Sequence, residues 1–525
     1  MIQTIFDWLE ERTGLVSGLH HALYEDIPAS AGWHQVLGAV ALFSFMTQFF
    51  TGVMLALNYA PTATEAHTSL KYILKELTGG QLMRGLHHWG ASMMVIIVVM
   101  HMIQAFIWGA YKKPREATWM VGVVLLLVTT VFGLTGYLLP WDNRAYWGTV
   151  VTTQIAGQAP VLGPYIEQLM GASNGVGAVT FTRFYSVHVM ILPLLTVFLI
   201  VLHVYLVRRH GVTPAADDNK PKKKFFPQQV FKDTFAVFIA FSILFALAIF
   251  AKVPLGRLAD PTDTAYIPRP EWYFLFLFQT LKYFEGPLEI VGSLVLPNLA
   301  IVVLFLVPFI DRGPAIRAAK RTYAMAVVFL VALGWSALTL AALRTSPNNA
   351  GDEISLEAPE PWQELGPEQL AGIGMFRKEG CAECHAAGKK PFKTQKEIDW
   401  VSDHVKEKHK GPSSDGQLRI LSNFSRKVSD ESIRNMTAAA QLPVEGAILY
   451  QANQCGACHE VNGVGMKTGP KLNGVIVRRT REWLTGHFLD PQKYSQGSPM
   501  PVYKFSPSEM ERMLAYLTSL PELPE

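Results

Sequence analysis

The clearest chemistry in this sequence belongs to its four cysteines, which form two C-x-x-C pairs, each followed directly by a histidine. The two sets are Cys381, Cys384 and His385, and Cys455, Cys458 and His459. Two thiols that can form thioethers, next to an imidazole that can bind iron, are the pattern of covalent c-type haem attachment. Zinc binding or thioredoxin-like redox chemistry is the alternative, but a zinc site needs further paired ligands and a redox pair need not precede histidine.

Four histidines inside long apolar segments are a second set of metal-binding candidates, because a histidine within a membrane span is costly and usually functional. His87 and His101 are 14 residues apart, and His188 and His203 are 15 apart. At 100° per residue, each pair returns to within about 60° of one helix face, with about 20 Å between its members. Two such helices present two imidazoles at each of two levels, which suits two six-coordinate haems.

His88 competes with its neighbour His87 for the same level. It points about 100° away around the helix, and only His87 keeps the 14-residue interval. We therefore favour His87 as the ligand.

Two neighbouring apolar segments carry glycine pairs with the same 14-residue separation: Gly38 and Gly52, and Gly122 and Gly136. Small residues let the edge of a flat porphyrin approach a helix backbone closely. Glycine is also common where membrane helices pack on one another. The matched intervals on four segments favour the porphyrin interpretation.

These residues lie in apolar segments that are long enough to cross a bilayer as helices. Seven are predicted, at approximately 33–57, 84–108, 119–139, 185–207, 230–251, 290–310 and 324–343. Lysine and arginine gather in the loops after the second, fourth and sixth segments, so these loops are expected in the cytoplasm. The odd number of spans then places the N-terminus inside and the residues after 343 outside, the side on which c-type haem is attached.

The composition agrees with a membrane region joined to further domains. The 525 residues are 50% apolar and 17% charged, which is too apolar for an ordinary soluble protein and too long for one domain. The net charge of +4 is modest, and basic residues are not interleaved with aromatic ones, so nucleic-acid binding is not expected. No removable signal peptide is predicted, so the first span is expected to act as the insertion signal.

Several segments resemble the cytochrome b subunits of respiratory and photosynthetic cytochrome bc complexes: RGLHHWGASMM, WMVGVVLLL, LTGYLLPWD, TRFYSVH and RPEWYF. The resemblance covers roughly residues 20 to 340. The 15-residue histidine interval is more similar to the photosynthetic branch, in which cytochrome b and its partner subunit are separate chains, whereas both parts are joined here. Relatives in that branch carry an extra covalent haem on a cysteine that aligns with Val36, so we expect that haem to be missing.

The fold class expected from these observations is all-α, a seven-span transmembrane helical bundle with two small α-helical cytochrome c domains. The predicted parts are an amphipathic surface helix (1–32), a four-helix haem b bundle (33–210), a three-helix quinol-site region (211–343), a linker (344–366) and two cytochrome c domains (367–442 and 443–525).

The resemblance implies a quinol-oxidising pocket on the outer face. Its motif is Pro270, Glu271, Trp272 and Tyr273. A carboxylate there could accept a quinol proton and pass it to the outer water, and Tyr273 could hold the quinol ring. A belt of interfacial aromatic residues with a solvated glutamate is the alternative. The segment 147–170 resembles the surface helix that completes this pocket, with Gly148 allowing close approach of the backbone.

On the inner face, Arg208 and Asp233 lie at the ends of the fourth and fifth spans, close to where the family reduces quinone. Either could contact quinone. For Arg208, a positive-inside anchor is the favoured alternative.

The two C-terminal repeats resemble small soluble cytochromes c. In the second repeat, GPKLNG and SPMP imply that Met500 is the sixth iron ligand opposite His459. The first repeat has no equivalent Met-Pro, and its candidate ligands are His409, His404 and Met436, of which we favour the two histidines. A solvated histidine is the alternative for those two.

The function that the resemblance implies is electron transfer in a proton-translocating quinol:cytochrome c oxidoreductase of the bacterial inner membrane. The expected cofactors are two non-covalent haem b and two covalent haem c groups, with quinone as substrate. The expected partners are a Rieske iron–sulfur protein, other subunits of the complex, a periplasmic electron acceptor, membrane lipid and a second copy of the chain. A cytochrome b that serves another dehydrogenase, or a non-catalytic carrier of c haems, remains open, and the 270–273 motif speaks against both.

Overall fold

A computed structural model of the chain describes residues 2–214, 221–259, 261, 266–313, 318–345, 361–378 and 439–522. The chain divides into two compact units. Unit 1 comprises Met1–Leu255 and Pro261–Asn349, and unit 2 comprises Gly256–Asp260 and Ala350–Glu525.

Unit 1 is built from seven helical segments that are long and apolar enough to cross a membrane, counted over the described residues. They contain α3 (Leu37–Ala56), α5 (Gly80–Ile107), α6 (Glu116–Tyr137), α9 (Ala178–Ser186) continuing into α10 (Leu192–His210), α11 (Gln228–Phe250), α13 (Leu296–Ile310) and α14 (Thr322–Thr345). The expected seven-span, all-α architecture is therefore confirmed.

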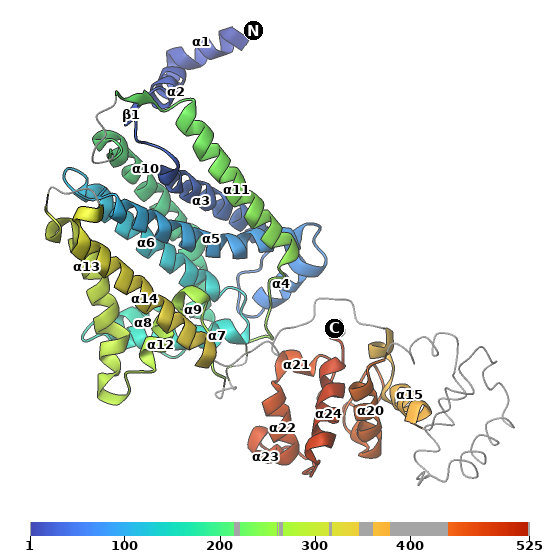
Figure 1. Ribbon diagram of the computed structural model, residues 1–525. Coiled ribbons are helices and arrows are strands. Elements are labelled where there is room, and N and C mark those ends of the chain that lie inside the picture. Colours follow the sequence, from blue (N-terminus) through green and yellow to red (C-terminus); the bar gives the residue numbers. More distant parts are fainter. Residues whose placement is uncertain are drawn as a thin grey trace, which may run out of the picture. The chain divides into compact units, whose positions relative to one another are not determined.

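Short elements lie at the two ends of this bundle (Figure 1). At the N-terminal end lie α1 (Ile2–Thr13), α2 (Leu15–Leu23) and the antiparallel strands β1 (Asp26–Ile27) and β2 (Lys223–Lys224). At the opposite end lie α4 (Ala66–Lys75), α7 (Asn143–Gly157), α8 (Gly163–Met170) and α12 (Leu275–Leu281). We call this second end the Glu271 end, because Glu271 lies just before α12.

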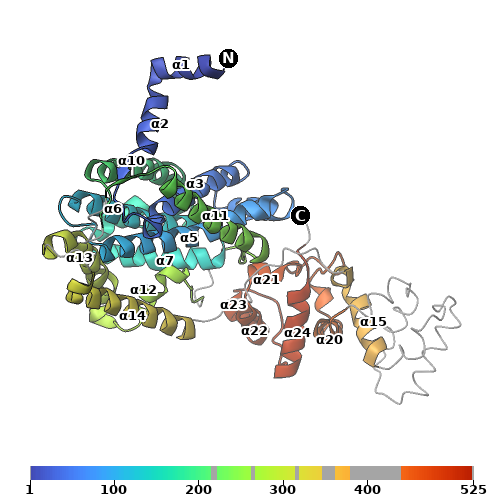
Figure 2. The ribbon, with the colours of Figure 1, turned by 45° about the horizontal axis from the view of Figure 1, so that its top comes forward.

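The haem-ligand candidates lie on helices that pack in two pairs, α3 with α5 and α6 with α10. A third contact joins α5 to α11, where Gly85 meets the backbone of the partner helix: a Cβ atom at Gly85 would lie 2.9 Å from the carbonyl oxygen of Ala248. Figure 2 shows α12 and α14 on one flank of the bundle and α3 and α11 on the other. The four helices that carry the histidine and glycine pairs therefore lie together.

The fourth span contains a wide turn beside one of the histidines. Val187–Ile191 is a π-helical turn that includes His188 and precedes Leu192 and Pro193. Proline has no N–H group to bond the carbonyl four residues earlier, so the helix loosens there. A π-turn contains one residue more than an α-turn needs. The extra residue explains why the interval from His188 to His203 is 15 residues whereas that on α5 is 14.

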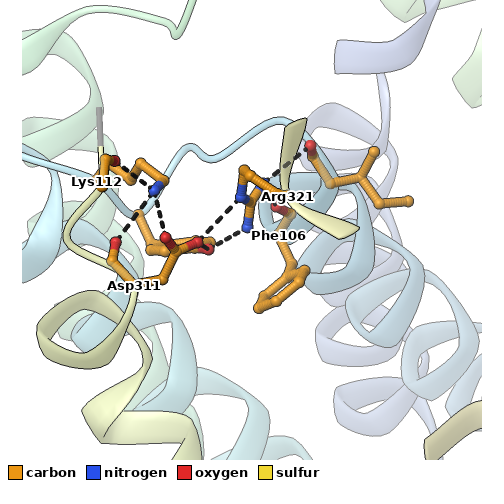
Figure 3. Close-up of polar contacts among 7 residues, drawn as sticks. Phe106, Lys112, Asp311 and Arg321 are labelled. Atoms are coloured by element: carbon orange, nitrogen blue, oxygen red, sulfur yellow. Dashed lines mark hydrogen bonds and ion pairs between the residues drawn. The ribbon is translucent and has the colours of Figure 1, made fainter. Parts of the chain in front are cut away.

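A polar cluster at the N-terminal end joins the loop after α5 to the loop between α13 and α14 (Figure 3). Asp311 accepts hydrogen bonds from Lys112 Nζ at 2.6 Å, Tyr111 Oη at 2.5 Å and Arg321 Nε at 3.0 Å. The Arg321 guanidinium also donates to the carbonyl of Phe106 at the end of α5, at 2.9 Å. These bonds connect α5 and the loop after it to the last two spans, α13 and α14.

Unit 2 has one hydrophobic core in its described residues. The helices around it are α15 (Pro367–Lys378), α20 (Gln441–Ala452), α21 (Val475–Arg478), α22 (Arg481–Leu489), α23 (Pro491–Tyr494) and α24 (Pro507–Ser519). The helix before the first C-x-x-C-H, α15, packs on the helix before the second, α20, and α24 packs on the same helix. Residues of both cytochrome c repeats thus share this core.

Candidate haem and quinol sites

The four histidines of the spans meet in two pairs. The ring centroids of His87 on α5 and His188 in the π-turn lie 6.4 Å apart, and those of His101 and His203 on α10 also lie 6.4 Å apart. Two metal–nitrogen bonds of about 2 Å and two half-rings of about 1.2 Å add up to about 6.4 Å. Each pair therefore has room for one iron atom between its two imidazoles.

Threonine hydroxyls contact the Nδ1 atoms of His87 and His188, the histidine pair nearer the Glu271 end. Thr51 Oγ1 lies 3.0 Å from His87 Nδ1, and Thr135 Oγ1 lies 3.0 Å from His188 Nδ1. Each hydroxyl donates its own proton to a helix carbonyl, at 2.7 Å for Thr51 and 2.8 Å for Thr135. The hydroxyl oxygen can therefore accept a hydrogen bond from Nδ1–H, which leaves the Nε2 lone pair for iron.

The second pair lacks this support. In the part of the chain that the structure describes, the buried Nδ1 atoms of His101 and His203 have no hydrogen bond of normal geometry. At the first histidine pair, a threonine precedes each of the two glycines. At the second pair, the residues before Gly38 and Gly122 are Leu37 and Val121. The two levels therefore differ in how firmly their imidazoles are oriented.

Each of the four glycines with the 14-residue spacing lies against one of these rings. A Cβ atom would lie 3.5 Å from His101 Cε1 at Gly38 and 3.2 Å from His87 Cε1 at Gly52. At Gly122 and Gly136 it would lie 3.4 Å and 2.7 Å from Cε1 of His203 and His188. The contact with the imidazole is the immediate reason for glycine at Gly136, because a side chain there would displace the ring.

One cavity joins the first histidine pair to the Glu271 end. Its volume is about 480 Å³, and His87, His188, Arg144, Glu271 and Tyr273 are among its lining residues. A largely apolar cavity with a few converging polar groups is typical of a cofactor or ligand site. The predicted quinol residues Glu271 and Tyr273 therefore border the same space as the predicted haem ligands.

Glu271 is held by an arginine from outside the 270–273 motif. Arg144, in the first turn of α7, donates from Nη2 to Glu271 Oε1 at 3.2 Å and from Nε to the carbonyl of Arg269 at 3.0 Å. Tyr137 Oη donates to the same carbonyl at 3.2 Å. Burial raises the pKa of the Glu271 carboxyl, and the Arg144 charge opposes part of that rise.

Other residues of the predicted pocket have different neighbours. Tyr273 lies against α6, where a Cβ atom at Gly133 would be 2.8 Å from its hydroxyl, and burial raises its pKa. Trp272 Nε1 donates to Ser92 Oγ on α5 at 3.2 Å. Pro270 directly precedes Glu271 in the chain. Gly148 on α7 faces the Tyr137 ring, with 2.7 Å from its would-be Cβ to Cε1. Gly148 thus makes room for the tyrosine that holds the Arg269 carbonyl.

The two inner-face candidates have separate polar partners. Arg208 forms an ion pair of 2.5 Å with Glu25, which lies just before β1. Asp233 accepts a hydrogen bond from Gln229 Nε2 at 2.9 Å. Their role at an inner quinone site remains a prediction.

The second C-x-x-C-H forms a compact loop in unit 2. His459 Nδ1 lies 2.8 Å from the carbonyl of Pro470, so Nδ1–H can donate there and leave Nε2 for a metal. A Cβ atom at Gly469 would lie 2.8 Å from His459 Cε1. Met500 packs against the core of unit 2. These features fit a c-type haem next to Cys455 and Cys458, which are separate thiols here.

The first C-x-x-C-H lies outside the described residues. So do the candidates for its sixth ligand. These residues are Cys381, Cys384, His385, His404, His409 and Met436.

Comparison with known proteins adds to this geometry. The family model of cytochrome b/b6/petB matches residues 26–211, that of cytochrome b(C-terminal)/b6/petD matches residues 258–353, and that of cytochrome c matches residues 443–521. The chain is 38% identical over 209 residues to cytochrome b6 of Synechococcus sp. (strain JA-3-3Ab), which is 40% of this chain and 97% of that protein. This chain belongs to the cytochrome b/b6 family. A second relative, cytochrome b6 of Acaryochloris marina (strain MBIC 11017), is 39% identical over the same shares of the two chains.

The structure of this cytochrome b is similar to a solved hyperthermophilic respiratory Complex III. The TM-score is 0.57 at 29% identity, over 65% of this chain and 92% of that chain. The chain is therefore an electron-transfer subunit of a bc-type quinol:cytochrome c oxidoreductase, a multi-subunit membrane complex. It joins both cytochrome b parts and a cytochrome c domain in one polypeptide.

The sequence carried a signal for some of the residues that we missed. Thr51 and Thr135 directly precede Gly52 and Gly136, so a Thr-Gly pair marks both positions of the first level. Arg144 carried no such signal, because its partner Glu271 is 127 residues away.

Proposed function

We propose that the cavity at the Glu271 end oxidises membrane quinol. The observation that supports this most directly is that Glu271 and Tyr273 line the same cavity as His87 and His188. A quinol there would lie beside a proton acceptor, in a cavity that also borders the predicted haem ligands. We further propose that one electron passes to a separate Rieske iron–sulfur protein and onward to the c haems, and the other to the b haems.

Different residues of the cavity have different roles in the proposed quinol oxidation. The Glu271 carboxylate accepts a proton from the quinol hydroxyl as the quinol loses electrons. The Tyr273 hydroxyl donates a hydrogen bond to a quinol oxygen and orients the ring. The predominantly apolar lining excludes bulk water, which strengthens these polar contacts.

Two haem b groups are proposed at the histidine pairs, held by His87 with His188 and by His101 with His203. Two haem c groups are proposed at the C-x-x-C-H motifs, the second with Met500 as its sixth ligand. When bound, these groups take up and release single electrons. The residues of the chain fix the imidazole orientation at the first level through Thr51 and Thr135.

The remaining parts of the proposal concern place and partners. The complex lies in a bacterial inner membrane, with the Glu271 end and the c domains on the periplasmic side, and it works as a homodimer. Quinone is reduced at the N-terminal end near Arg208 and Asp233, with proton uptake there. The loop charges support this orientation, since they put basic residues at the inner ends of the spans.

The experiment compares Glu271→Gln with Glu285→Gln in the purified complex. Loss of a general base costs about 100-fold or more in rate, so quinol-dependent reduction of the b haems should slow by about that factor in Glu271→Gln. Glu285, in the loop after α12, does not line the cavity, and its variant should keep the wild-type rate. A redox difference spectrum checks the haem content. A wild-type rate in Glu271→Gln with full haem content would rule out the proposed site.

A further inference from the structure

We propose that Arg144 is a positioning residue for the Glu271 carboxylate: it holds that group ionised and aimed into the cavity, and thereby sets the acidic limit of quinol oxidation. This inference rests on the quinol-oxidising function proposed above. It adds a residue to that site that the 270–273 motif does not contain.

The first support is that Arg144 fixes both the side chain and the backbone of the Glu271 segment. One guanidinium nitrogen, Nη2, binds the Glu271 carboxylate at 3.2 Å, while Nε binds the Arg269 carbonyl two residues earlier at 3.0 Å. The planar guanidinium sets the angle between these two bonds. A quinol-facing carboxylate on an otherwise irregular loop is thus tied to the start of α7.

The second support is that Arg144 is itself held in place. Asp142 caps α7 by accepting a hydrogen bond from the Ala145 amide at 2.9 Å, which fixes the first turn of the helix. The Arg144 guanidinium carbon lies 5.8 Å from the centre of the Tyr137 ring, and Tyr137 Oη donates to the same Arg269 carbonyl. The ion pair is partly screened from water, with 33% of the Arg144 side chain and 19% of the Glu271 side chain exposed.

The third support is the balance of charges around Glu271. The titratable and charged groups near it are Arg144 and Asp142 at the start of α7, Tyr137 on α6, Tyr273 in its own segment, and Arg84 and His88, which α5 contributes to the cavity. Burial and Asp142 favour the neutral carboxyl, and Arg144 favours the ionised one. Removing the arginine charge should therefore raise the pKa of Glu271.

The functional consequence follows from the sign of that shift. Only the ionised carboxylate can accept a quinol proton, so the rate falls as the pH drops through the pKa of Glu271. An opposite charge at this distance lowers a carboxyl pKa by about one unit or more. Without Arg144, the acidic limb of the pH–rate profile should therefore move upward by about one pH unit.

The experiment measures the initial rate of quinol-dependent b-haem reduction against pH in the purified complex. Arg144→Met, which removes the charge at similar volume, should shift the acidic limb upward by about one pH unit. Arg144→Lys keeps the charge but loses the fork of two bonds, so its limb should shift less. Arg183→Met is the matched control: Arg183 binds the carbonyls of Gln168 and Leu169 instead, and its limb should not move.

The outcomes separate this inference from the function on which it rests. If Glu271→Gln removes the acidic limb but Arg144→Met leaves it unmoved, the inference about Arg144 is wrong and the quinol site stands. Equal shifts in the lysine and methionine variants would also overturn it, because the charge would then have no effect. If Glu271→Gln keeps the wild-type profile, the proposed function fails first. Should the methionine variant not accumulate, Arg144→Gln removes the charge instead, and an unmoved limb in that variant overturns the inference.

Discussion

Single contacts decide whether each histidine can serve as an iron ligand. The His188 ring is enclosed from two directions, by the Thr135 hydroxyl at its Nδ1 and by the Cα of Gly136 beneath its Cε1. Both neighbours come from α6, so one helix orients the proposed iron ligand on another. The same arrangement occurs at His87, where α3 supplies Thr51 and Gly52. A change of one atom at these positions should therefore change haem binding.

Gly136→Ala tests this at the closest contact. The added Cβ would lie 2.7 Å from His188 Cε1, a distance at which the ring must move. We expect the variant to lose the b haem held by His87 and His188, which a redox difference spectrum with quantified haem would show as about half of the non-covalent haem. Gly334→Ala on α14 is the control, because nothing lies within 4 Å of its new Cβ. Full b-haem content in Gly136→Ala would contradict the proposed ligand geometry.

At the scale of elements, the register of the helices brings these contacts together. The fourth span needs a π-turn at Val187–Ile191 because its histidines are 15 positions apart, one position more than those on α5. The last two spans are joined to α5 by a buried polar cluster around Asp311. The π-turn sets the register of one helix, and the Asp311 hydrogen bonds fix how the last two spans meet α5.

Deleting one residue tests the role of the π-turn. Removal of Val189 should convert the π-turn to a regular α-turn and keep His188 and His203 in register, so the b haems should be retained. Removal of Val197, in the regular part of α10, should rotate one histidine by about 100° relative to the other and abolish binding of at least one b haem. Haem content per polypeptide is the measurement. The same loss in both deletions would show that the π-turn has no such function.

Asp311→Ala tests the polar cluster. It leaves the buried Arg321 and the partly buried Lys112 without their carboxylate, which should lower the free energy of unfolding by about 3 kcal/mol. Asp26→Asn is the control: both side chains of its pair with Lys224 are 54% exposed, so its loss should cost much less than that of Asp311. Thermal unfolding of the detergent-solubilised protein would compare the two, and equal melting temperatures would contradict the prediction.

The Asp311 cluster also predicts a pH dependence of stability. Burial raises the pKa of Asp311, but the hydrogen bonds from Lys112, Tyr111 and Arg321 outweigh it, so the pKa is lower than usual. A carboxyl with a lowered pKa stabilises the fold above its unfolded pKa of about 4 and loses that contribution below it. The difference between wild type and Asp311→Ala should therefore be constant above about pH 5 and shrink toward more acidic pH.

The whole chain combines two units with different tasks, a membrane bundle and a cytochrome c unit. In unit 2, α15 comes from the segment before the first C-x-x-C-H, yet it completes the core around the second. Asn462 strengthens this link, since its Nδ2 donates to the carbonyls of Gln363 and Leu365, both at 2.8 Å. The segment before the first C-x-x-C-H is thus connected to the second repeat by packing as well as by sequence.

Gly374→Ala tests this shared core. The new Cβ would lie 2.6 Å from Val444 Cγ1 on α20 and would force α15 away, at a cost of about 1–3 kcal/mol. We expect the unfolding of unit 2, followed by Soret circular dichroism, to move down by about 5 °C or more. Gly366→Ala in the same segment should melt as wild type, because its Cβ would be 3.4 Å from Val464. An unchanged midpoint in Gly374→Ala would show that α15 is not part of this core.

The sequence by itself determined the seven spans and the family, and it placed both histidine pairs at spacings that the structure brings together. These features have a local period: a run of apolar residues or a 14-residue interval is visible along one helix at a time. The predicted limits of the spans were less exact than their number: the second span was expected to begin near residue 84, but α5 begins at Gly80. Polar residues at its start remain helical, and hydropathy does not mark such an end.

Only the tertiary structure decided which distant residues meet. Arg144 and Glu271 are 127 residues apart, and Lys112 and Asp311 are 199 apart. No periodicity relates such positions, because their contact depends on how helices cross and where loops return. The polar partners of the site were therefore beyond sequence reasoning, although its candidate ligands and its carboxylate were not.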